Sequence, residues 1–175
     1  NEKIEKIKKA PNGFCLAKWY QVTIDLSRGY THSCHHPERH KIPVDEIQRN
    51  PSALHNTHFK KNQRKMMLEG RRPPECDYCW KIEDSHNDNI SDRFIKSSDD
   101  WAYPHLENTL KLPWDKDITP TYLEVMFSSE CNLNCAYCMA DISSSIEREM
   151  DKYGPYPVIS NQHRMPKKFE IKSPN

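Results

Sequence analysis

The stretch that decides the fold is residues 122–138, YLEVMFSSECNLNCAYC. Its first six residues form a β-prone run, in which aromatic and β-branched side chains favour a strand. A loop with three cysteines follows at once, and a helix is expected over roughly Ser144–Lys152. A strand, a cysteine-rich loop and a helix in this order predict a βα unit.

The loop places the thiols of Cys131, Cys135 and Cys138 within eight residues. Thiolates are soft ligands that select zinc, Cu(I) or iron–sulfur clusters. A structural zinc ion prefers four protein ligands, and Asp141 or His163 are candidates for the fourth. A cubane cluster needs no fourth protein ligand, because one of its irons stays open for an exogenous ligand.

This loop resembles that of the radical S-adenosylmethionine superfamily, which has Cys-x3-Cys-x2-Cys after a strand and an aromatic residue before the last cysteine. The resemblance implies that Cys131, Cys135 and Cys138 hold a [4Fe–4S] cluster and that Tyr137 lies against the adenine of S-adenosylmethionine. In that family the reduced cluster cleaves the cofactor to a 5′-deoxyadenosyl radical, which abstracts hydrogen from the substrate. The implied activity is an oxidoreductase-type radical reaction supplied with electrons by a reductant such as flavodoxin or ferredoxin.

Four further cysteines, Cys15, Cys34, Cys76 and Cys79, lie upstream of the loop. A β-hairpin is expected over residues 19–34, with its turn at Gly29 and with Cys34 at its end. Cys76 and Cys79 are three residues apart in an expected short helix, so their thiols share one face. Four thiols from a hairpin and a helix can converge on one site, and a structural zinc ion suits them.

The same four cysteines resemble the auxiliary-cluster modules of radical S-adenosylmethionine enzymes, the twitch domain and its longer SPASM form. Their signature is Cys, a gap, Gly-x4-Cys and a closing CxxC, which Cys15, Gly29, Cys34, Cys76 and Cys79 match. This resemblance implies a second [4Fe–4S] cluster, with zinc as the alternative. The module precedes the catalytic core here, whereas it follows the core in most relatives. That order resembles a set of proteins seen in phage and marine sequences, and the resemblance covers about residues 14–150.

The expected fold class is α/β: a small twitch-like module of a β-hairpin and helices, then the first βα unit of a truncated partial (β/α) barrel. The expected division is a charged lead-in at 1–12, the auxiliary module at 13–84, a polar linker at 85–119 and the start of the core at 120–175. The chain lacks an initiator Met, and 37 residues follow Cys138, too few for a barrel. We therefore expect a fragment that is inactive on its own.

The composition of the chain limits the classes of partner that we expect. Hydrophobic residues make up 35% of the chain, and the net charge is +1. Without a strong positive charge or a long apolar run, we expect neither a nucleic-acid nor a membrane partner. The basic residues between positions 60 and 72 are expected to form a solvated helix face, and the histidines at 32, 35, 36 and 40 a solvated loop.

Seven cysteines exclude a complete disulfide framework within one chain, because the count is odd. Their clustering favours metal binding in a reducing compartment, so we expect a cytoplasmic protein of a bacterium or of a phage-infected host. Three functions remain open. The first is a radical enzyme whose substrate is a peptide or a protein, as is common in relatives with auxiliary clusters. The second is a zinc-stabilised, cysteine-rich binding module without catalysis. The third is an electron-transfer or scaffold protein whose clusters never meet S-adenosylmethionine.

Overall fold

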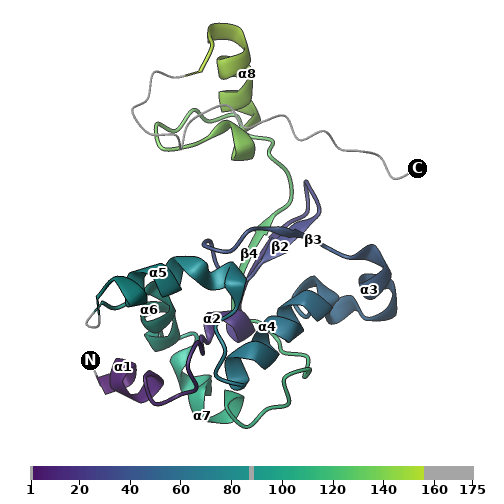
Figure 1. Ribbon diagram of the computed structural model, residues 1–175. Coiled ribbons are helices and arrows are strands. Elements are labelled where there is room, and N and C mark those ends of the chain that lie inside the picture. The colour runs from purple at the N-terminus through teal and green to yellow at the C-terminus, as the bar shows by residue number, and fades with distance from the viewer. Residues whose placement is uncertain (1, 87–88, 156–175) are drawn as a thin grey trace. The chain divides into compact units, whose positions relative to one another are not determined.

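The computed structural model describes residues 2–86 and 89–155, and it divides into two compact units, Asn1–Met126 and Phe127–Asn175 (Figure 1). Each unit is described by itself. The helical elements of the first unit are α1 (Glu2–Ile7), α2 (Ala17–Tyr20), α3 (Val44–Arg49), η1 (Pro51–Leu54), α4 (His58–Leu68), η2 (Pro74–Cys76), α5 (Asp77–Ser85), α6 (Asp92–Ser98), η3 (Tyr103–His105) and α7 (Leu106–Thr109).

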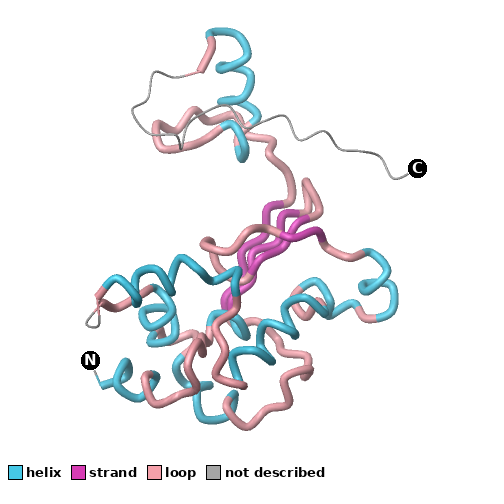
Figure 2. Tube along the Cα trace, viewed as in Figure 1, coloured by secondary structure: helices cyan, strands magenta, loops and turns pink. Residues whose placement is uncertain are grey.

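One mixed sheet accompanies these helices (Figure 2). Its strands are β1 (Gln21–Asp25), β2 (Tyr30–His32), β3 (His40–Lys41) and β4 (Tyr122–Met126), in the spatial order β3-β2-β1-β4. Strands β1, β2 and β3 pair antiparallel, whereas β4 pairs parallel with β1. The fold is therefore mixed helix and sheet, in agreement with the α/β expectation.

The predicted hairpin is confirmed as β1 and β2, and Gly29 in its turn has a φ of +72°. The buried Asp25 fixes this turn, because its carboxylate accepts a hydrogen bond from the backbone N–H of Arg28 at 3.1 Å. The first strand begins at Gln21 rather than Trp19, since residues 17–20 form the short helix α2.

The core is built around residues 13–22, here called the central segment, every one of which is buried. A buried backbone must find hydrogen-bond partners inside the protein. Side chains distant in the sequence supply them: Arg93 donates to Phe14 O at 2.9 Å, Ser97 Oγ accepts from Leu16 N, Arg64 donates to Lys18 O at 3.0 Å, and His55 bonds Trp19 O at 2.6 Å. The core therefore needs polar residues from α4, α6 and the chain after η1.

Two segments expected to be peripheral belong to this core. In the lead-in, Ile4 and Ile7 of α1 are buried, because residues three apart share a helix face. In the expected linker at 85–119, Phe94, Ala102 and Leu106 join the same hydrophobic cluster. Both segments are mostly polar, so the few apolar residues that they carry at helical spacing did not predict a buried helix face.

A further boundary differs from expectation. Thr57 caps α4 by accepting a hydrogen bond from Lys60 N at 3.1 Å, and so separates α4 from η1. Strand β4, expected to open the core domain at residue 120, instead completes the sheet of the first unit.

The second unit contains η4 (Ala140–Ile142) and α8 (Ser144–Tyr153), which confirms the helix predicted after the cysteine loop. Ser143 caps α8 by accepting from Ile146 N, and Ile146 and Met150 form its small core with Ala140. None of the helices in the described ranges is long and apolar enough to span a membrane.

The buried lead-in helix generates a prediction. We expect Ile7→Ala to lower the free energy of unfolding by about 2–4 kcal/mol, because it leaves a cavity where a side chain is 1% exposed. The exposed Lys8→Ala is the control and should change the value by less than about 0.5 kcal/mol. Urea denaturation followed by circular dichroism measures both, and equal effects would contradict the placement of α1.

Candidate functional site

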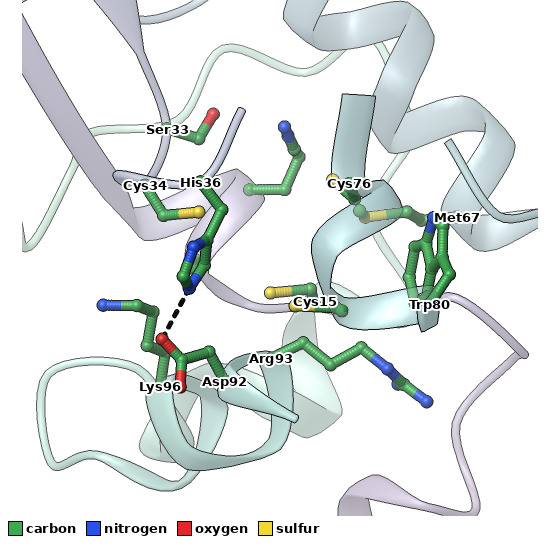
Figure 3. A pocket seen from close by; sticks show the side chains of 13 residues that line it. Cys15, Ser33, Cys34, His36, Met67, Cys76, Trp80, Asp92, Arg93 and Lys96 are labelled. Atoms are coloured by element: carbon green, nitrogen blue, oxygen red, sulfur yellow. Dashed lines mark hydrogen bonds and ion pairs between the residues drawn. The ribbon is translucent and has the colours of Figure 1, made fainter. Parts of the chain in front are cut away.

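All four upstream cysteines line one pocket in the first unit (Figure 3). Cys15 lies in the central segment, Cys34 follows β2, Cys76 ends η2 and Cys79 lies in the first turn of α5. All four thiols are free, and about 390 Å³ of the pocket, its mouth included, is not filled by protein atoms. The structure thus brings together thiols that are up to 64 positions apart in the sequence.

Hydrogen-bond donors reach three of these sulfurs. Ser97 Oγ lies 4.0 Å from Cys15 Sγ. A backbone hydrogen bond from His36 acts on Cys34, and bonds from the backbone of Arg93 and the side chain of Ser91 act on Cys79. Burial raises the pKa of Cys34 and Cys79, and these hydrogen bonds act in the opposite direction. They lower the pKa and so favour the thiolate. Donors placed around sulfur in this way also tune bound clusters.

Burial opposes ionisation of the same thiols. Together with a smaller effect of the neighbouring Cys15, it raises the pKa of Cys34 to about 11, that of Cys76 to about 12 and that of Cys79 to about 11. The protein alone therefore keeps these thiols protonated at neutral pH. A bound metal reverses this preference, because a coordinating thiol loses its proton.

A buried cation faces the thiols. Lys18 is 3% exposed, lines the pocket and forms an ion pair with Glu75. Burial, the largest influence, acts to lower the pKa of Lys18, but Cys76 and Cys34 once ionised, and the carboxylate of Glu75, raise it above its usual value. Lys18 therefore carries a positive charge beside two of the sulfurs, where it favours a site of negative charge.

Two more cations of α4 are buried, and the expectation of a solvated basic face is wrong for them. Arg64 is fully buried, where it donates to Lys18 O and to Asn56 Oδ1. Lys60 is 1% exposed and donates from Nζ to Thr31 Oγ1 at 2.8 Å. Burial first, then repulsion from Lys18 and Arg64, lowers the pKa of Lys60 to about 6.

The buried lysine generates a prediction. Because the pKa of Lys60 is lower in the folded chain than in the unfolded one, stability falls as pH drops from its unfolded pKa towards 6. We expect Lys60→Met to raise the free energy of unfolding at pH 7 by about 1–3 kcal/mol, since the buried amine is removed. Thr31 keeps a partner, because its hydroxyl also donates to Leu54 O.

The measurement is urea denaturation at several pH values between 6 and 9. The rise in stability across this range should be smaller in Lys60→Met than in the wild type. The exposed Lys65→Met on the same helix is the control and should keep the wild-type slope. A Lys60→Met protein that is less stable at pH 7 would contradict the prediction.

The second unit holds the loop with Cys131, Cys135 and Cys138, all partly buried. The loop is attached to the start of α8, because Cys131 N donates to Ser144 Oγ at 3.1 Å. Within the loop, Leu133 N donates to Cys131 Sγ at 3.4 Å. The chain thus presents three accessible thiols on irregular backbone, and one of them already accepts a backbone hydrogen bond.

Tyr137 is the residue for which an adenine contact is predicted. Its side chain is 85% exposed, so its ring is open to contact by a ligand. A hydrogen bond with Cys135 is the main cause of the raised pKa of Tyr137. Of the residues considered as a fourth zinc ligand, His163 and the side chain of Asp141 lie outside the described part of the chain.

The distances between the thiols determine whether they can bind a single metal ion or a cluster. In the described ranges, the one group of metal-ligating side chains close enough to hold a single ion is His35, His36 and Asp92, and it includes no cysteine. Four thiolates on one zinc ion lie about 3.8 Å apart, given zinc–sulfur bonds of about 2.3 Å. A [4Fe–4S] cluster binds each thiolate on a different iron and accepts a wider set. The chemistry of this donor set, four free thiols with nearby hydrogen-bond donors and a facing cation, is compatible with such a cluster.

Sequence reasoning missed the contribution of α6. Ser91, Arg93 and Ser97 supply hydrogen bonds to the thiols or to the central segment, while Asp92 and Lys96 line the pocket. The available signal was Ser91 followed by an acidic residue, which is a common helix start. That signal locates the helix but does not show that it reaches the cysteines.

Searches against protein-family models, curated proteins and solved structures find no match to this chain.

Proposed function

We propose that this chain is part of a radical S-adenosylmethionine enzyme with an auxiliary [4Fe–4S] cluster. Cys131, Cys135 and Cys138 would hold the first cluster, and the four thiols of the pocket would hold the second. The observation that carries the proposal is the convergence of Cys15, Cys34, Cys76 and Cys79 on one pocket, beside the ammonium of Lys18.

Charge balance supports an anionic occupant in the pocket. Lys18, Arg93 and Lys96 line the pocket, and Glu75 and Glu83 are the carboxylates paired with Lys18 and Arg93. A thiolate-bound cluster is anionic and would be stabilised by positive charge at the pocket, and the donors from α6 would stabilise its sulfurs.

In the second unit, the chain's own residues would bind and orient the cofactors. The three thiols would hold a cluster, and the exposed ring of Tyr137 would contact the adenine. When bound, the cluster and S-adenosylmethionine supply reductive cleavage of the cofactor and hydrogen abstraction from the substrate. The backbone N–H of Leu133, which already donates to Cys131 Sγ, would stabilise a thiolate there.

The partners belong to the same proposal. A peptide or protein is the proposed substrate, and flavodoxin or ferredoxin the proposed reductant. Such a radical enzyme would work in the reducing cytoplasm. A zinc-stabilised binding module is the alternative, and metal content separates the two.

The first test is anaerobic reconstitution with iron and sulfide, followed by metal analysis. Two clusters predict about eight irons per chain, and Cys135→Ala and the double variant Cys76→Ala/Cys79→Ala should each reduce this to about four. Each variant is the matched control for the other site, because the cysteines belong to different units. S-adenosylmethionine should change the EPR signal of reduced Cys76→Ala/Cys79→Ala but not that of Cys135→Ala. Stoichiometric zinc in place of iron would overturn the proposal.

A second test addresses Lys18. We expect Lys18→Met to make the pocket cluster harder to reduce, because the variant removes a positive charge that stabilises the added electron. The equilibrium constant for reduction should fall about tenfold, which corresponds to about 59 mV for one electron. An EPR-monitored redox titration in the Cys135→Ala background measures the pocket cluster alone.

Two controls test whether a shift in the potential comes from the charge of Lys18. Lys65→Met removes an exposed lysine of α4 and should leave the potential unchanged. Lys18→Met combined with Glu75→Gln removes both charges of the ion pair and should restore most of the potential. If Lys18→Met does not shift the potential although iron is fully incorporated, the role of Lys18 is wrong.

A further inference from the structure

A second group of ligand side chains lies beside the thiol pocket and includes no cysteine. His35 and His36 follow β2, and Asp92 is the first residue of α6, 56 positions after His36. His36 and Asp92 also line the pocket, and they face one another in Figure 3. The two histidines were expected to be solvated loop residues, which agrees with the exposure of His35 but not with the position of His36.

The geometry of this group is close to that of a metal site. His36 Nε2 lies 2.7 Å from Asp92 Oδ2, and His35 Nε2 lies 3.7 Å from the same oxygen. One ligand atom from each of the three residues can be chosen so that all lie within 4.8 Å of one another. Ligands at about 2.0–2.1 Å from a tetrahedral ion are about 3.4 Å apart, so small side-chain rotations suffice.

The ring of His36 is held in place before any ion binds. It stacks on Tyr78 with ring centroids 3.7 Å apart and an interplanar angle of 12°, and its side chain is 12% exposed. His35 is 62% exposed, so the group opens to solvent on its side. One stacked imidazole, one carboxylate and one exposed imidazole together form a site that an ion can enter from water.

We propose that His35, His36 and Asp92 form a binding site for a divalent transition-metal ion, separate from the thiol-bound groups. Two imidazoles and one carboxylate suit Zn²⁺, Fe²⁺, Co²⁺ or Ni²⁺, whereas a site of thiolates alone selects softer metals and clusters. Three protein ligands leave further coordination positions for water or a substrate atom, as in catalytic metal sites. The site does not depend on the radical S-adenosylmethionine proposal, because it uses none of the cysteines.

Cobalt is the probe, because its absorption spectrum distinguishes ligands. We expect Co²⁺ added to the iron-reconstituted chain to bind at the site at one equivalent. The difference spectrum between this sample and Asp92→Asn treated in the same way removes the absorption of the clusters and of any cobalt held by free thiols. It should contain the weak d–d bands of nitrogen and oxygen ligands without thiolate-to-cobalt charge-transfer bands. Iron analysis of the same sample reports on the clusters separately, so failure of the cluster proposal and failure of this site give different results.

Three variants test the assignment. Asp92→Asn keeps a hydrogen-bond partner for His36 but removes the negative charge, and His35→Gln changes an exposed residue, so both should fold. We expect each to weaken Co²⁺ binding at least tenfold, while the exposed His58→Gln leaves it unchanged. The proposal is overturned if the wild type binds no Co²⁺ with this spectrum, if charge-transfer bands accompany it, or if His35→Gln and Asp92→Asn bind as tightly as the wild type.

Discussion

The structure of the first unit depends on one constraint, the complete burial of the ten-residue central segment 13–22. A backbone removed from water needs internal hydrogen-bond partners, and here side chains rather than neighbouring strands supply many of them. Arg93 and Ser97 of α6 and Arg64 of α4 serve this purpose. Because the segment also carries Cys15 and Lys18, the residues that stabilise its backbone lie next to the thiol pocket. The fold and the candidate site therefore share the same polar contacts.

Much of the fold could be predicted from local patterns. The hairpin, β4 and α8 follow from β-prone runs, a turn glycine and a capped helix. The packing of α1 and α6 into the core and the burial of Lys60 and Arg64 could not be predicted in this way. A lysine or arginine on a helix usually points to solvent, and only the needs of the distant central segment bring Arg64 inside.

Some residues of the candidate site could likewise be predicted from local patterns, and others could not. Cysteine spacing selected the four residues that line the pocket, since thiols have few alternative roles in a polar chain. The donors Ser91 and Ser97 carried no comparable signal, because serine is common on every surface. The pairing of His36 with Asp92 joins residues 56 positions apart, and no local pattern connects them. Prediction of which residues come together thus succeeded where the residue type itself is informative, and failed where only tertiary proximity gives a residue its role.

The parallel pairing of β1 with β4 has a consequence for the way the chain folds. Paired residues such as Thr23 and Glu124 are 101 positions apart, and such pairing is slow because a long loop must close first. Every cysteine of the pocket except Cys15 lies inside that loop. Assembly of the pocket would draw Cys34, Cys76 and Cys79 towards the central segment and so shorten the loop that the pairing of β1 with β4 has to close.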